Sequence, residues 1–254
     1  MKLITDSHRF SIPRLPSAHD TLLPRVLFSH RALHMRERFL DIFGRNISPT
    51  LPRSPQSTVL HLVAEDFDAN TDEWVDREQG FIFSSLGSPE LVGDVINGNP
   101  AVRYDGNSAG HYNSSFTIQQ PYAKIAVFKF RSVNNSTSQY VTDSLNEESR
   151  GVLGHRDGRF GMWSNKWLTG SSVGTSWIIG TAIYDNPNSE LYRNTEVEAT
   201  GESGIDDMDG MAIAVNHDLD SRWGPIDLAE LLVLGDISDV ALAEEILNQV
   251  YAVY

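Results

Sequence analysis

The chain has 254 residues, a net charge of −14 and no cysteine. This length suits one large domain or one domain with an appended arm, and the lack of cysteine excludes disulfides and thiolate metal sites. No run of 18 apolar residues occurs and the first residues lack the apolar core of a signal peptide, so we expect neither membrane insertion nor a secretion leader.

The charge is distributed unevenly along the chain. Residues 1–56 hold nine Lys and Arg against four acids, a net of +5, whereas the remainder holds 11 bases and 30 acids, a net of −19. A basic segment next to an acidic one indicates that the basic part docks on something acidic. Nucleic-acid binding by the acidic part is disfavoured, because phosphate contacts need clustered Lys and Arg.

Residues 1–47 are predicted to form a basic anchoring arm. Apolar residues three or four apart predict an amphipathic helix over roughly residues 21–43. The residues expected to contact an assembly partner are Leu23, Leu27, Arg31, Arg36, Phe39 and Phe43. Residues 48–57 carry a proline at every third position, which is typical of an extended, semi-rigid linker. The remaining segment, 58–254, is predicted to be the folded domain.

After the linker, short β-rich runs alternate with turn residues, and no helical pattern alternates with them, which favours an all-β, antiparallel sandwich. The clearest runs are Thr58–Val63, Ala123–Phe130, Gln139–Thr142, Arg159–Trp163, Ser176–Tyr184, Met211–Val215 and Leu228–Leu234. The last segment differs, because Ser238 suits an N-cap and apolar residues follow at helical spacing up to Tyr254. We expect a short C-terminal helix that packs on the sandwich.

Four segments, in this order along the chain, carry a resemblance to a known family. They are Asn97–Gly106, Tyr122–Phe130, Ser189–Asn194 and Asp227–Leu234, the last followed by Ile237-Ser238-Asp239 and the predicted helix. Together they resemble the laminin-G-like, concanavalin-A-like jelly-roll family, although Thr195 stands where a glycine is usual. The resemblance implies two packed antiparallel sheets with a concave face. Family members bind sugars, bind proteins, or serve as structural modules in secreted and phage proteins.

Tryptophan side chains are the best candidates for sugar stacking, because an exposed aromatic face can pack on a pyranose ring. Trp167 and Trp223 are predicted on loops, where a role at a protein interface is an equal alternative. Trp74 is a third candidate. Trp163 and Trp177 fall inside β-rich runs and are predicted in the core.

Asp66, Asp68, Asn70 and Asp72 place oxygen ligands at alternate positions, as at the start of a calcium loop. The pattern lacks a glycine at its sixth position and has Arg77 at its twelfth, where glutamate is usual. A solvated acidic loop is therefore favoured over a calcium site, and we expect no other cofactor.

Two motifs bear on catalysis. Gly170–Gly174 matches G-x-S-x-G, but a strand is predicted after it, where a nucleophile elbow needs a helix, so a turn between strands is favoured. Glycoside cleavage needs two carboxylates that flank the bond, and the acids at 65–68 do not supply the alternating family pattern. The chain is therefore predicted not to be an enzyme.

Three functions follow from these patterns. The leading prediction is a bacteriophage virion protein, a capsid decoration or fibre module, located in the virion after assembly in the host cytoplasm. Its partners would be other virion proteins, further copies of itself, trimers included, and a host surface glycan. The alternative is a carbohydrate-binding, lectin-like module of a bacterial surface protein. A polysaccharide-degrading enzyme ranks third.

Overall fold

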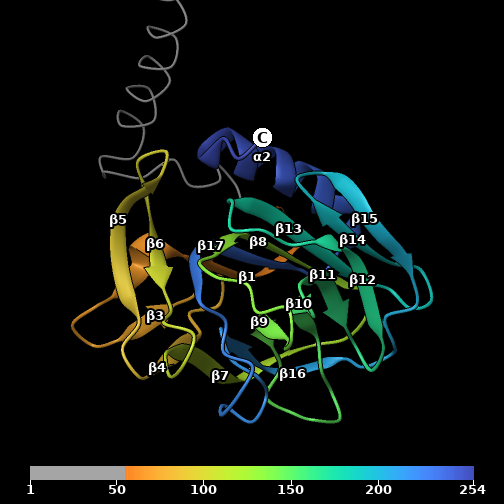
Figure 1. Ribbon diagram of the computed structural model, residues 1–254, viewed down its shortest axis with the longest axis horizontal. Coiled ribbons are helices and arrows are strands. Elements are labelled where there is room, and N and C mark those ends of the chain that lie inside the picture. The colour runs from red at the N-terminus through yellow and green to blue at the C-terminus, as the bar shows by residue number, and fades with distance from the viewer. Residues whose placement is uncertain (1–54, 56) are drawn as a thin grey trace, which may run out of the picture. The chain divides into compact units, whose positions relative to one another are not determined.

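The computed structural model describes residue 55 and residues 57–254 (Figure 1). These residues lie in one structural unit, Leu51–Tyr254. The predicted arm, with all six of its assembly residues, and the predicted linker apart from Pro55 and Ser57 lie outside the described residues. Within residues 57–254 no helix combines the length and the apolar character that crossing a bilayer requires.

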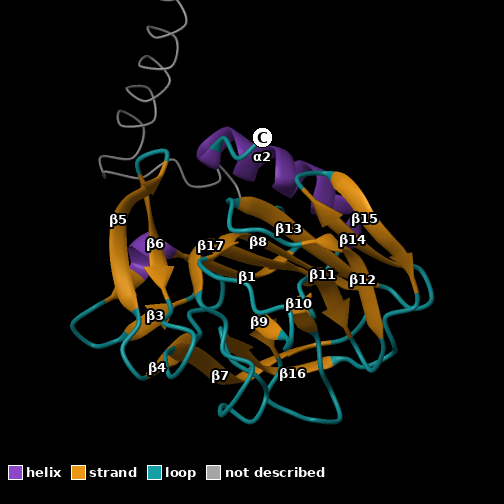
Figure 2. Ribbon diagram, viewed as in Figure 1, coloured by secondary structure: helices purple, strands orange, loops and turns teal. Residues whose placement is uncertain are grey.

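The strands form two antiparallel sheets, which confirms the predicted sandwich (Figure 2). The first, here called the helix-side sheet, has the order β15-β14-β13-β8-β17-β6-β5, and β1 also pairs with β17. Its strands are β1 (Thr58–Val63), β5 (Glu90–Ile96), β6 (Asn99–Arg103), β8 (Tyr122–Phe130), β13 (Ile178–Tyr184), β14 (Ser189–Arg193), β15 (Glu196–Gly201) and β17 (Ile226–Leu234).

The second, here called the open sheet, has the order β12-β11-β10-β9-β16-β7-β4-β3-β2. Its strands are β2 (Phe67–Asp68), β3 (Glu73–Val75), β4 (Ile82–Leu86), β7 (Gly110–Ile118), β9 (Gln139–Asp143), β10 (Val152–Arg156), β11 (Arg159–Trp163), β12 (Trp167–Ser172) and β16 (Met208–Ile213). The described helical segments are η1 (Ala64–Asp66), η2 (Ile237–Asp239) and α2 (Val240–Tyr251).

The helix-side sheet is buried on both faces, which explains why its central strands are almost continuously apolar. In β8, Ala126 and Phe128 enter the core between the two sheets. Ile125 and Val127 on the same strand enter a second core beneath α2. Successive side chains of a strand point to opposite faces, so a strand covered on both sides has no position left for polar alternation.

The C-terminal helix lies on the helix-side sheet, as Figure 1 shows. A buried polar contact fixes it there, because the Tyr251 hydroxyl donates to Glu230 on β17 at 2.6 Å. The start predicted for this helix, with Ser238 as its N-cap, was wrong. The Asp236 carboxylate accepts from the Ser238 backbone N–H at 2.9 Å and so caps the short segment η2. The helix α2 begins only after η2, at Val240. The predicted apolar stripe ends one turn early, because Tyr254 lies beyond the helix and is exposed.

Candidate functional site

Strand register places one set of side chains on the outer surface of the open sheet. In the β10–β11 pair, Leu153 faces Met162 and both enter the core between the sheets. The alternate pairs therefore lie on the other face. One of these pairs is Val152 with Trp163, and another is Arg156 with Arg159.

Trp167 extends this outer surface, because it pairs with Trp163 across β11 and β12. Its indole lies against Gly161, where an added Cβ would come within 3.2 Å of Cε3. It also approaches Tyr140 on β9, with 6.3 Å between ring centroids, and Tyr140 pairs with Gly154. The absence of a side chain at Gly161 thus leaves room for the Trp167 ring, which lies near the rings of Trp163 and Tyr140.

Arg150 supports these rings from the loop before β10. Its guanidinium lies over the Trp163 ring at 4.5 Å and 5.8 Å from the Tyr140 ring, distances at which a cation is attracted to an aromatic face. Asp143 holds it in place through two hydrogen bonds, of 3.1 and 2.5 Å. Burial raises the pKa of the fully buried Asp143, and the hydrogen bond from Arg150 opposes that rise.

Further cations surround the rings. Arg156 lies over the Trp167 ring at 5.8 Å and is 3.6 Å from the exposed Asp157 carboxylate. Arg159 is exposed and has no ion pair with any residue in the described part of the chain. We call this surface, consisting of Trp163, Trp167, Arg150, Arg156 and Arg159 above the buried Tyr140, the aromatic–arginine face.

The sequence predictions for tryptophan are partly wrong. Trp74 is fully buried and donates to the Val63 carbonyl at 2.7 Å, so it offers no face to a ligand. Trp163 is only half-buried and faces outward, although it was predicted in the core. Trp167 is outward-facing but begins a strand instead of lying on a loop. Trp223 lies on a loop as predicted and donates to the Asp220 carbonyl at 3.2 Å.

The alternation of β11 could have placed Trp163 correctly. Phe160 and Met162 are both in the core, and they stand two residues apart. Because strand residues two apart share a face, Arg159, Gly161 and Trp163 must share the opposite one.

The predicted calcium ligands do not gather around a common point. The Asp66 carboxylate binds the Arg77 guanidinium, with one contact of 3.0 Å. Asp68 accepts from the backbone and side-chain nitrogens of Asn70, and these hydrogen bonds lower its pKa. Within residues 57–254 no three His, Asp or Glu side chains form a metal-binding group. This geometry does not support a calcium site.

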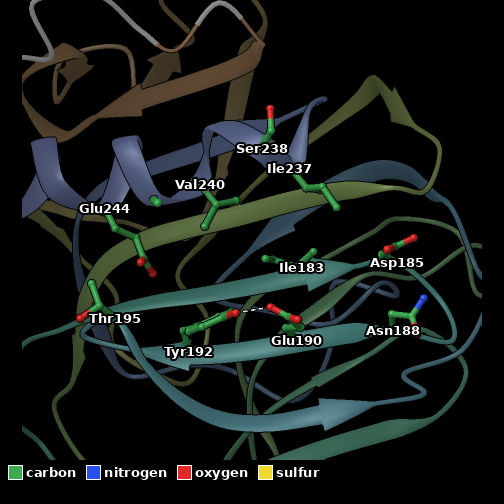
Figure 3. Close-up of a pocket in the computed structure, with 11 residues that line it drawn as sticks. Ile183, Asp185, Asn188, Glu190, Tyr192, Thr195, Ile237, Ser238, Val240 and Glu244 are labelled. Carbon is green, nitrogen blue, oxygen red and sulfur yellow. Dashed lines mark hydrogen bonds between the residues drawn. The ribbon is translucent and has the colours of Figure 1, made fainter.

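A separate cavity of about 490 Å³ lies between the β13–β14 strands and the start of α2 (Figure 3). Asp185, Glu190 and Glu244 contribute carboxyl groups to its lining. The Tyr192 hydroxyl donates to Glu190, and that hydrogen bond together with burial raises the pKa of Tyr192 to about 12. Glu244 accepts from the Thr181 hydroxyl at 2.5 Å, and burial raises its pKa. The cavity is acidic, and two of its three carboxyl groups are bonded to neighbouring hydroxyls.

The G-x-S-x-G segment is not a nucleophile elbow. Ser172 is the last residue of β12, and the next element is the strand β13. This confirms the interpretation as a turn between strands, because an elbow requires a helix after the serine.

Comparisons with known proteins show the fold and no family. No family model matches the chain, and no curated protein matches its sequence. Among solved structures, domain 4 of AbnA, an extracellular arabinanase of family GH43 from Geobacillus stearothermophilus, solved with arabinotriose, matches with a TM-score of 0.54 and 16% identity. The match covers 70% of this chain and 92% of that one.

The binding region of botulinum neurotoxin is similar too. A type C structure, from work on cell entry through two ganglioside molecules, has a TM-score of 0.55 and 13% identity, covering 74% of this chain and 51% of that one. The type DC binding domain with SialylT has a TM-score of 0.53 and 12% identity, covering 74% and 51%. The chain thus spans about half the length of these toxin structures. At such identities the likeness establishes the sandwich fold alone, in line with the concanavalin-A-like architecture that the resemblance implied.

Proposed function

We propose that residues 58–254 form a non-catalytic carbohydrate-binding module whose recognition surface is the aromatic–arginine face. The observation that carries this proposal is the position of Trp167, outward on a strand with its indole laid over a glycine. A pyranose ring presents a face of C–H groups that packs on an aromatic ring, while its hydroxyls need hydrogen-bond partners. The face offers both, because guanidinium groups border its rings.

The packing of the face also favours binding. Asp143 and Arg150 hold Trp163 from one side, and Tyr140 lies beside Trp167. Side chains held in place before a ligand arrives lose less conformational entropy when it binds. The likeness to an arabinanase domain solved with arabinotriose and to toxin domains linked with gangliosides supports the same function by analogy of fold.

The virion role predicted from the arm has less support. None of the solved structures named above is a virion protein, and the arm lies outside the described residues. The carbohydrate-binding alternative therefore becomes the main proposal. Removal of residues 1–56, followed by light scattering, remains the test of the arm as an assembly device.

A glycan array followed by calorimetry on the best ligand tests the proposal. We expect binding, and Trp167→Ala should weaken it by about 30-fold, which corresponds to the roughly 2 kcal/mol of a buried aromatic anchor. Trp223→Ala is the matched control, because it removes a half-buried indole outside the face and should leave affinity unchanged. An array without binders, or equal affinity for the Trp167 variant and the parent protein, would contradict the proposal. Reducing-sugar release from a bound polysaccharide would instead indicate an enzyme.

A further inference from the structure

We propose that the glycan recognised by the aromatic–arginine face is anionic, with a carboxylate or sulfate group that the arginines bind. This inference rests on the carbohydrate-binding function proposed above and names the class of its ligand. It follows from three observations: where the few cations of the domain gather, how two of them are paired, and how far they lie from the aromatic rings.

Cations are scarce in this domain, and three of them belong to the face, while another three surround Asp227. Residues 57–254 contain 11 Lys and Arg against 30 acids, and Arg150, Arg156 and Arg159 all belong to the face. Arg222 is close enough that its charge, like that of Arg150, opposes the rise that burial causes in the pKa of Tyr140. A domain with this net charge repels anions at long range. Arg150 is paired with Asp143, so Arg156 and Arg159, which have no buried carboxylate partner within residues 57–254, form the local exception.

Arg156 and Arg159 form a pair that the fold does not require. A two-residue turn, Asp157-Gly158, joins β10 to β11, with φ angles of 52° and 74°. This is the left-handed backbone of a tight hairpin, and it sets the two arginines directly opposite each other. Like charges placed opposite each other destabilise a sheet. An anion bound between them would remove that repulsion.

The charge of this pair is available to a ligand. Arg156 and Asp157 are 51% and 61% exposed, and exposed ion pairs of this kind contribute little energy. Arg159 has no acidic partner among the described residues. A guanidinium donates two parallel hydrogen bonds to a carboxylate or sulfate, which a neutral hydroxyl cannot accept in the same way.

The spacing fits an oligosaccharide. Arg159 and Trp163 share a face and are four residues apart on β11, a separation of about 13 Å at the usual rise of a strand. Only glycine lies between them on that face, at Gly161, with Gly154 opposite it. A sugar ring packed on Trp167 would share the indole face with the Arg156 guanidinium, and a neighbouring sugar could place its acidic group at Arg159.

An array of matched glycan pairs tests the inference. The pairs are oligogalacturonides with free or methyl-esterified carboxyls, keratan with or without sulfate, and lactose with or without sialic acid. We expect the acidic member to bind more tightly in at least one pair, and the pair concerned distinguishes a carboxylate ligand from a sulfate ligand. Arg159→Gln should reduce that preference about tenfold, the usual effect of losing one charge-assisted hydrogen bond.

Lys166→Gln is the matched control, because it makes the same change in net charge on the neighbouring β11–β12 turn, where Lys166 pairs with Glu202 at 2.6 Å. It should keep the preference. If neutral members bind as well as acidic ones and Trp167→Ala abolishes both, the module binds glycans but the anionic inference is wrong. An acidic preference that survives Arg159→Gln would also overturn it. If no member binds, the glycan-binding function itself fails, and an acidic protein surface becomes the ligand to test.

Discussion

Replacement of Lys124 by methionine should remove a pH dependence from the stability of the sandwich. Lys124 lies on β8 among residues of the inter-sheet core and is 0% exposed. Its ammonium group donates to the Thr142 hydroxyl at 3.1 Å and to the Gly151 carbonyl. Burial lowers the pKa of Lys124 from 10.5 to about 7, although the nearby Asp143 carboxylate opposes that shift.

The direction of the pH effect on stability follows from which state, folded or unfolded, keeps the Lys124 proton. Between pH 7 and pH 10.5 the unfolded chain keeps the Lys124 proton while the folded chain loses it, so stability rises with pH across this window. Each pH unit in this window raises the free energy of unfolding by up to about 1.4 kcal/mol. Because Lys124 is only partly deprotonated in the folded chain near pH 7, the free energy of unfolding rises by about 2 kcal/mol in total between pH 7 and pH 9. Below pH 7 both states are protonated and the effect is constant.

Urea unfolding of the parent protein and of Lys124→Met at pH 7 and pH 9 measures this difference. The parent should gain about 2 kcal/mol more than the variant between the two pH values. At pH 7 alone the variant should differ little, because the loss of a buried cation is offset by two acceptors left unpaired, at about 1–3 kcal/mol each.

Lys129→Met is the control, since Lys129 lies on the same strand but is 25% exposed and pairs with Asp227 at 3.2 Å. It should keep the pH response of the parent. If Lys124→Met also kept that response, the lysine would not be the group that titrates and the reasoning would be refuted.

Two further substitutions test local features of the fold. Thr195→Gly should raise the melting temperature by a few degrees, because Thr195 is β-branched and has a φ of 66°, a conformation that costs L-residues about 1–2 kcal/mol, only partly offset by the flexibility of glycine. A lower melting temperature would contradict this. Asp143→Asn should lower the free energy of unfolding by about 3 kcal/mol, since Arg150 would lose its buried partner. Urea titration checks this, and a loss below about 1 kcal/mol would show that the pair contributes little.

The strands were predictable because each is a local pattern of β-branched and aromatic residues bounded by turn residues. The predicted runs Thr58–Val63 and Arg159–Trp163 match β1 and β11 to the residue. Other runs were shifted by a few residues, as at β16, which spans Met208–Ile213 instead of 211–215. The first and last residues of a strand depend on which residues hydrogen-bond to neighbouring strands. Because those partner strands are distant in sequence, a local pattern does not predict the strand ends.

The candidate site was predictable only in part. Trp167 was selected from the sequence, but Trp163 was assigned to the core and Trp74 to the surface, and each assignment was wrong. The arginines of the face were not selected at all. The Arg-Asp-Gly-Arg order at 156–159 does contain a hairpin signal, and that signal alone sets two arginines opposite each other.

The sequence by itself determined the class of fold, because period-two patterns and turn residues act over a few neighbouring positions. It also required Lys124 and Lys129 to lie on opposite faces of β8, since they are an odd number of residues apart. Only the tertiary structure decided which of them is buried. It also brought Asp143 and Arg150 against Trp163, and Tyr140 against Trp167. These contacts form only when separate strands pair and pack. The residues that stabilise them are distant in sequence, so no local sequence pattern predicts them.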